Sequence, residues 1–294
     1  MILVPVMSGK GGVGKTTVCI GVGLALVKQG IPTAILDLDL ENPSLGTACG
    51  LTRVDLGFRG EHIIPPTWNG LRIMSLSLML LPDFIYTPTL VVEERKHELI
   101  TQLAKEVDWG DSEVILIDMP PGSGEEVRGL LQFPIKGTIL VTSPQSLSEA
   151  AVRRLVLMAE EYSLPILGIV ENNINRAPGE AGQRISEDYK ILYLGKIGWN
   201  KEIVESMEAH QPFTHQTFIT VAEAISNKLL KQEEADSSDN STGFGAEGVV
   251  QNGSRDGQQE GAGQGDQREV SGVLPTDGGD GNSPAPTGDR SRRP

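Results

Sequence analysis

The feature that most constrains the fold is a glycine-rich segment between an apolar run and a stretch with helical spacing. Residues 9–16 read GKGGVGKT and match the pattern G-x-x-x-x-G-K-[ST]. The apolar run Ile2–Met7 precedes the segment, and the helical stretch Thr16–Gln29 follows it. Glycines in this context allow successive backbone N–H groups to converge on phosphate oxygens at a helix N-terminus. The sequence therefore predicts a P-loop, and with it a strand that leads directly into a helix.

The first 231 residues alternate between short apolar runs and longer stretches of helical pattern. Further strands are predicted at residues 33–38, 71–76, 114–118, 138–142, 166–170 and 191–194. Further helices are predicted at residues 91–107, 147–162, 201–208 and 216–231. Continuous apolar strands that alternate with helices indicate a parallel sheet covered on both faces. We therefore predict an α/β fold with a doubly wound, mostly parallel sheet, of the P-loop NTPase type.

The composition changes after residue 231. Residues 232–294 contain 12 acidic and 5 basic residues, 13 of the 35 glycines, and one aromatic residue, Phe244. Such a segment buries too little apolar surface to offset the entropy lost on ordering. We predict one P-loop ATPase domain over residues 1–231 and a disordered, acidic, glycine-rich tail over residues 232–294.

Composition and charge argue against several classes of protein. No apolar run approaches the ~20 residues of a membrane span, and the N-terminus lacks the pattern of a signal peptide. The formal net charge of -14 argues against nonspecific binding to nucleic acid. Two cysteines, Cys19 and Cys49, do not make a disulfide scaffold and fit a reducing compartment. We expect a cytoplasmic protein that has no nucleic-acid partner.

The P-loop assigns roles to residues around a bound nucleotide. Lys15 is expected to reach the β- and γ-phosphates, and the Thr16 hydroxyl is expected to coordinate Mg²⁺. We therefore predict that ATP and Mg²⁺ are the cofactors. The predicted nucleotide-binding residues of the loop are Gly9, Lys10, Gly11, Gly12, Val13, Gly14, Lys15, Thr16 and Thr17.

Acidic residues follow two of the predicted strands. Asp118 ends the apolar run in VILIDMPPGSGE, where a carboxylate at the tip of a strand holds the Mg²⁺ water shell. Residues 120–122 (PPG) then predict a turn beside the γ-phosphate. Asp37 and Asp39 in ILDLDLENPSLG share one side of their strand and face the ligand crevice. A turn or capping role is the alternative interpretation of Asp39.

The loop carries a second lysine, Lys10, directly after its first glycine. This arrangement resembles the deviant Walker A motif of dimeric ATPases such as MinD, ParA and the nitrogenase iron protein. The resemblance implies that Lys10 crosses a homodimer interface to the partner's nucleotide. It also implies that Asp39 orients the attacking water and that Asp37 joins Thr16 and Asp118 around Mg²⁺. We therefore expect Lys10, Lys15 and Asp39 to be catalytic, although Lys10 as a solvated surface lysine is the alternative.

Four segments resemble, in order, the Mrp/ApbC family of iron–sulfur carrier ATPases over roughly residues 1–230. They read MPPGSGE, GTILVTSPQSLSEAAVRR, LPILGIVENN and LGKIGWNKEIVESMEAHQPF. The resemblance implies hydrolysis of ATP to ADP and phosphate. It also implies that Asn172 reads the adenine edge, and a buried or capping asparagine is the alternative.

The chain departs from this family at one place. Typical members carry a C-x-x-C pair shortly after the VEN segment, and two such pairs in a dimer hold a [4Fe–4S] cluster. The corresponding stretch here, VENNINRAPGEAGQRIS, contains no cysteine. Cys19 is expected in the core. Cys49 follows the Asp39 segment, and its exposure is left open, but a single cysteine is too small a ligand set for a cluster. We therefore expect no iron–sulfur cluster at the site that relatives use.

Three functions follow from these observations. The first is a dimeric ATPase that assists metal-cluster assembly on a client apoprotein or assembly partner, without the typical cluster site. The second is a positioning or partitioning ATPase like MinD or ParA. The third is a nucleotide-dependent binding module with little turnover.

Overall fold

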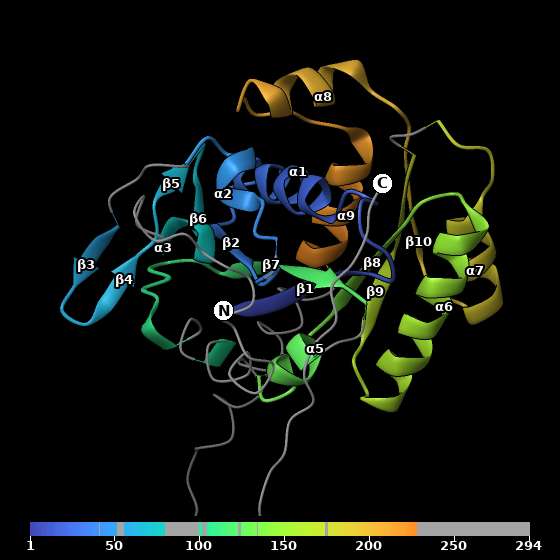
Figure 1. The fold of residues 1–294 in the computed structure, drawn as a ribbon, viewed down its shortest axis with the longest axis horizontal. Helices are drawn as coiled ribbons and strands as arrows, with labels where there is room; N and C mark the ends of the chain where they lie inside the picture. The colour runs from blue at the N-terminus through green and yellow to red at the C-terminus, as the bar shows by residue number, and fades with distance from the viewer. Residues whose placement is uncertain are drawn as a thin grey trace, which may run out of the picture. The chain divides into compact units, whose positions relative to one another are not determined.

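The main element of the protein is an eight-stranded sheet with the strand order β10-β9-β8-β1-β7-β2-β6-β5 (Figure 1). The computed structural model describes residues 1–40, 42–51, 56–79, 100–101, 105–122, 125–133, 135–173 and 176–227. Neighbouring strands of this sheet pair in parallel, except that the edge strand β5 is antiparallel to β6. The strands of the sheet are β1 (Ile2–Ser8), β2 (Thr33–Asp37), β5 (Thr67–Trp68), β6 (Leu71–Ser75), β7 (Val114–Pro121), β8 (Thr138–Thr142), β9 (Ile166–Asn172) and β10 (Tyr193–Ile197).

Helices follow most of these strands, and a small separate hairpin precedes β5. The hairpin consists of β3 (Gly57–Arg59) and β4 (His62–Ile64). The helices are α1 (Lys15–Lys28), α2 (Leu45–Ala48), α3 (Leu76–Met79), α5 (Glu125–Leu130), α6 (Ser146–Glu161), α7 (Ala181–Tyr189), α8 (Lys201–Glu208) and α9 (Gln216–Ile225). Figure 1 shows α1 and α9 on one side of the sheet and α5 on the other.

Alternate residues of the central strands divide the core into two layers. On β7, Val114 and Leu116 join a cluster with residues of α1 and α9. Ile115 and Ile117 join a second cluster with residues of α5, α6 and α7. Successive strand residues point to opposite faces, so both faces of the sheet must be covered by helices. The predicted doubly wound, mostly parallel sheet is confirmed.

Most predicted elements are present, with differences at their ends. The strand predicted to end at Asp118 continues to Pro121, because Gly122 donates a backbone hydrogen bond to Ser8 and keeps β7 beside β1. Pro120 and Pro121 of the predicted turn are therefore strand residues, whereas Gly122 has a left-handed φ angle of 100°. The elements that were not predicted are the helices α2, α3, α5 and α7 and the short strands β3, β4 and β5. Most of the predicted helix over residues 91–107, the end of that over residues 216–231, and the tail lie outside the described residues.

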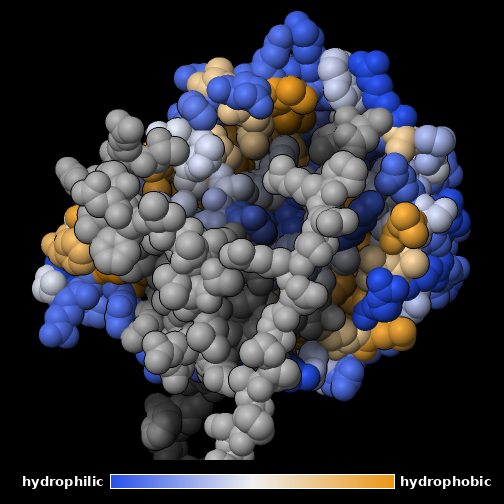
Figure 2. All heavy atoms as spheres, in the orientation of Figure 1, coloured by the Kyte–Doolittle hydropathy of each residue, from blue (hydrophilic) through white to orange (hydrophobic). Residues whose placement is uncertain are grey.

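The exposed large hydrophobic side chains are scattered over the described surface. They include Leu147 and Leu157 on α6, Val204 on α8, and Trp199 just before α8. Figure 2 shows hydrophobic residues in separate small patches among hydrophilic ones on the face drawn. Within the described part of the chain, no helix is both long and apolar enough to cross a bilayer.

Candidate functional site

The P-loop connects β1 to α1 at the carboxyl edge of the sheet. Gly12 and Gly14 have φ angles of 74° and 86°, a left-handed conformation that favours glycine. Gly14 is the N-cap residue of α1 and has no side chain that could accept a hydrogen bond from the first turn of the helix. A glycine-rich loop that ends at a helix N-terminus is the arrangement that suits a phosphate.

The two lysines of the loop differ in environment. Lys15, the first residue of α1, is 8% exposed, whereas Lys10 is exposed. Lys10 borders a pocket of about 120 Å³ together with Gly12, Ser143 and Gln145. The side chain of Lys15 is thus buried at the start of α1, whereas that of Lys10 is open to solvent. Their predicted roles stay predictions.

The structure brings Thr16 and Asp118 together. The Thr16 hydroxyl donates to Oδ2 of Asp118 at 2.5 Å and lies 3.2 Å from the Ser44 hydroxyl. The other carboxylate oxygen, Oδ1 of Asp118, is buried and has no nitrogen or oxygen donor among the described residues; the Cys19 thiol lies beside the carboxylate. Hydroxyl and carboxylate oxygens are the ligands that Mg²⁺ prefers, so this donor set fits the predicted metal.

Asp37 lies beside Asp118 because β2 and β7 are neighbours and pair these two residues directly. Asp37 is 1% exposed and accepts hydrogen bonds from the backbone of Asp39 and Leu45 and from the Ser75 hydroxyl. Three donors therefore hold this carboxylate and join it to the start of α2. Ser75 and Ser44 were not predicted as site residues.

Burial sets the proton affinity of this carboxylate pair. Burial, and secondly the nearby Asp118, raise the pKa of Asp37 to about 7. Burial likewise raises the pKa of Asp118 to about 6, against the lowering effects of the Thr16 hydrogen bond and of Lys15. Both shifts disfavour the charged form, as expected for carboxyl groups that are removed from water.

The raised pKa values of Asp37 and Asp118 predict that the stability of the folded protein depends on pH. The protein is treated with a chelator, so that no metal ion binds these carboxylates. A carboxyl whose pKa is raised in the folded state binds more protons there than in the unfolded state. Its contribution to stability therefore falls as the pH rises from about 4 through the folded pKa. We expect Asp37→Asn to become more stable relative to wild type on going from about pH 5 to pH 8. Thermal melts at both pH values check this, and a difference that does not change with pH would contradict it.

Asp39 follows β2 and is half-buried. Its Oδ1 accepts a hydrogen bond from the backbone N–H of Asn42 at 3.0 Å. This contact is the turn role that was the alternative interpretation of Asp39. The carboxylate still lies two residues beyond Asp37 at the same edge, so its role toward the attacking water stays a prediction.

Asn172, the last residue of β9, is 1% exposed and packs directly against the P-loop. Its amide nitrogen donates to the carbonyl oxygen of Val13 at 2.9 Å. Its amide oxygen is buried and has no hydrogen-bond partner among the described residues. The side chain therefore has the buried position of the alternative interpretation, and one acceptor remains for a ligand. Reading of the adenine edge stays a prediction.

The described residues of the stretch that lacks the C-x-x-C pair make local contacts, and residues 174–175 lie outside the described part. The Asn173 side chain exchanges two hydrogen bonds with the backbone of Ala177, at 2.8 and 3.0 Å. The guanidinium of Arg176 lies over the ring of Trp199, with its carbon 3.9 Å from the ring centroid. A Cβ on Gly179 would lie 2.2 Å from the Pro144 carbonyl oxygen, so this stretch packs tightly on the β8–α6 loop.

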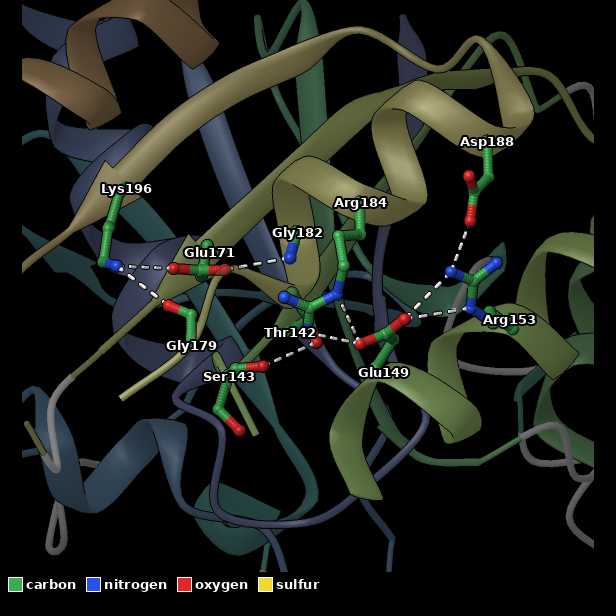
Figure 3. A network of polar contacts seen from close by, with 10 residues as sticks. All are labelled: Thr142, Ser143, Glu149, Arg153, Glu171, Gly179, Gly182, Arg184, Asp188 and Lys196. Atoms are coloured by element: carbon green, nitrogen blue, oxygen red, sulfur yellow. Dashed lines mark hydrogen bonds and ion pairs between the residues drawn. The ribbon is translucent and has the colours of Figure 1, made fainter. Parts of the chain in front are cut away.

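The C-terminal end of this stretch, at the start of α7, is anchored by a buried acid, Glu171. This residue was not predicted as part of the site. Glu171 is fully buried and accepts a hydrogen bond from the backbone N–H of Gly182 at 2.8 Å, in the first turn of α7 (Figure 3). The Lys196 ammonium lies 2.8 Å from the other carboxylate oxygen and so pairs the buried charge. Glu171 thus caps α7 from the neighbouring strand, a contact that nothing in the local pattern of VENN indicates.

The two cysteines are both buried. Cys19 is in the core, as expected. The exposure of Cys49, which the sequence left open, is settled by the structure: Cys49 is 2% exposed, because it follows α2 and packs into the core cluster on the α1 side of the sheet. Burial raises the pKa of the Cys49 thiol to about 12. Burial also raises the pKa of the Cys19 thiol well above its ordinary value. In the described residues, no group of three or more His, Cys, Asp or Glu side chains is arranged for a metal ion.

The sequence matches proteins connected with iron–sulfur clusters. The family model ParA, described as NUBPL iron-transfer P-loop NTPase, matches residues 2–232. The iron-sulfur cluster carrier protein of Saccharolobus solfataricus is 30% identical over 246 residues, 75% of this chain and 81% of that protein. The cytosolic Fe-S cluster assembly factor CFD1 of Kluyveromyces lactis is 32% identical over 231 residues, 72% of this chain and 81% of that protein.

Solved structures share the fold. The nucleotide-binding protein of Archaeoglobus fulgidus in complex with ADP is 28% identical with a TM-score of 0.60, over 71% of this chain and 86% of that chain. The septum site-determining protein MinD of Pyrococcus horikoshii, complexed with Mg-ADP, is 22% identical with a TM-score of 0.60, over 76% of this chain and 95% of that chain. The second likeness concerns the fold alone.

Proposed function

Because the chain belongs to the ParA family of NUBPL-type iron-transfer P-loop NTPases, as the resemblance to iron–sulfur carrier ATPases predicted, we propose that it binds Mg-ATP and hydrolyses it to ADP and phosphate. We further propose that this reaction drives a step in metal-cluster assembly on a client protein. The observation that carries the proposal is the contact between Thr16 and Asp118 at the start of α1. A hydroxyl and a carboxylate are the groups with which a P-loop holds the metal of its nucleotide, so this contact supports the proposal.

The residues of the site divide the work of phosphoryl transfer. Gly12, Gly14 and the first turn of α1 would offer backbone N–H groups to the phosphates. Lys15 adds a positive charge there, and Thr16 with Asp118 would hold Mg²⁺, which neutralises charge that develops on the transferred phosphoryl group. Catalysis of this kind is mainly positioning and electrostatic stabilisation.

We propose that two copies of the chain assemble around the nucleotides, with Lys10 of each acting in the site of the other. The exposure of Lys10, beside the buried Lys15, supports this assignment, because a group that acts on a partner must be accessible. A homodimer of this kind is closed and two-fold symmetric. We also propose a cytoplasmic location, which fits the two unpaired thiols, Cys19 and Cys49.

The missing cysteine pair limits how such an ATPase would handle a cluster. Iron–sulfur clusters are held by thiolates, and burial favours the neutral thiol at both Cys19 and Cys49. We therefore propose that the protein serves a cluster held by a client or an assembly partner. Nothing in this proposal requires a resident cluster.

One sample of purified protein can be used to test both whether the chain binds a cluster and whether it hydrolyses ATP. We expect protein reconstituted anaerobically with iron and sulfide and then desalted to be colourless. We expect its Mg²⁺-dependent phosphate release from ATP to be unchanged by an iron-selective chelator. Absorbance, metal analysis and phosphate assays check this. A brown protein with about four irons per dimer, lost in Cys49→Ser, would overturn the cluster part. Absence of phosphate release in the presence of Mg²⁺ would overturn the ATPase part.

A further inference from the structure

We infer that Asn172 is a positioning residue for the phosphate-binding loop, and that it acts on the triphosphate through the backbone of Val13. The inference rests on the proposed nucleotide function and deepens it. It assigns to Asn172 a role that is independent of the base, whereas a residue that only reads the adenine edge would not affect a ligand without a base.

The amide nitrogen of Asn172 is bonded to the P-loop, whereas its amide oxygen is not. The amide nitrogen of Asn172 donates to the Val13 carbonyl at 2.9 Å, and Val13 is itself buried. A Cβ on Gly14 would lie 2.2 Å from this nitrogen, so the amide is in close contact with the next residue of the loop as well. Asn172 therefore touches both residues that precede Lys15.

This contact fixes the direction of the peptide groups that face the phosphates. The carbonyl of Val13 and the N–H of Gly14 belong to one planar peptide unit, so holding the oxygen on the Asn172 side turns the N–H away from it. Gly14 then adopts its left-handed conformation and α1 begins at Lys15. Without the amide donor the Val13 carbonyl would be buried without this hydrogen bond, and the loop would no longer be held in one conformation before the ligand arrives.

The residue that precedes Asn172 on β9 is also held by contacts of its own. The preceding residue, Glu171, is on the opposite face of β9, where it binds the N–H of Gly182 and the ammonium of Lys196 (Figure 3). Consecutive residues of one strand therefore hold the P-loop on one face and α7 on the other. Asn172 has little freedom to follow the loop, which is what a positioning contact requires.

The test compares ligands with and without a base. Binding of ATP, GTP and inorganic tripolyphosphate, each with Mg²⁺, is measured by competition against a fluorescent ATP analogue. We expect Asn172→Ala to weaken ATP and tripolyphosphate by a similar factor of about ten, because both depend on the preformed loop. Asn172→Leu, which keeps most of the volume without the donor, is expected to give the same result and serves if Asn172→Ala fails to fold.

A structural control separates positioning from general destabilisation. Asn200 caps α8 by accepting hydrogen bonds from the backbone of Glu202 and Ile203, at 2.8 and 3.3 Å. Asn200→Ala is expected to lower the melting temperature but to leave tripolyphosphate affinity unchanged. An equal loss of affinity in Asn200→Ala would assign the effect to stability and overturn the inference.

The remaining outcomes are equally decisive. If Asn172→Ala binds tripolyphosphate like wild type and loses only its preference for ATP over GTP, Asn172 is a base reader and the inference is wrong. If wild type binds neither ATP nor tripolyphosphate, the proposed function itself fails. A similar loss for both ligands, with wild-type binding intact, supports the inference.

Discussion

Lys15→Ala is expected to weaken ATP binding by about 10²- to 10³-fold, because the substitution removes the charge that the loop places against the phosphates. The effect should be large because Lys15 is only 8% exposed, so water screens its charge poorly. Its ammonium also lies near Asp118 and lowers the pKa of that carboxyl, so its loss should favour the protonated form of Asp118. Calorimetry with Mg-ATP measures the change.

The same helix supplies a matched control for this prediction. Lys28 ends α1, is exposed, and lies at the end of the helix away from the P-loop. Lys28→Ala removes the same charge from the same helix and should bind ATP as wild type does. Unchanged ATP affinity in Lys15→Ala would show that the glycine-rich loop is not a P-loop in function.

Lys10→Ala is expected to bind ATP but to hydrolyse it about 10³- to 10⁵-fold more slowly, by analogy with arginine fingers supplied in trans. The substitution leaves Gly12, Gly14 and Lys15 in place, so binding within one subunit should persist. Single-turnover phosphate release measures the rate, and light scattering with ATP measures dimer formation. Lys136→Ala, which removes another exposed lysine, should leave both unchanged.

Mixed dimers decide whether Lys10 acts across the interface. Lys10→Ala and Asp39→Ala proteins should each be nearly inactive, and their mixture should regain activity, because one composite site then retains both groups. Action of Lys10 within its own subunit would leave the mixture inactive. A protein that stays monomeric with ATP, and whose Lys10→Ala form turns over normally, would refute the dimer.

Most strands of the central sheet could be predicted because they are short, continuous apolar runs, whereas the two-residue edge strand β5 gives no such pattern. Val114 to Ile117 on β7 fill both layers of the core, and that pattern is visible in the residues themselves. The meeting of Thr16 with Asp118 could also be anticipated, since a P-loop and the tip of a neighbouring parallel strand share one edge of the sheet. For these strands and for the contact between Thr16 and Asp118, the local sequence pattern agrees with the tertiary structure.

The contacts that escaped prediction depend on residues brought together by the fold. Ser75 reaches Asp37 only because β6 lies next to β2, and Glu171 reaches Gly182 only because α7 packs beneath β9. The burial of Cys49 depends on the four-residue helix α2, which is too short to give a periodic pattern. No local signal specifies these contacts, since each depends on the placement of a second segment.

The stretch between Asn172 and Gly182 is anchored to the rest of the fold at both of its ends. One end is tied to the P-loop through Val13, and the other is tied to β9 through Glu171. Both bonds join the side chains of Asn172 and Glu171 to backbone groups of Val13 and Gly182. Substitutions within residues 176–181 therefore leave both bonds in place, and the contact of β9 with the P-loop does not depend on which side chains these residues carry.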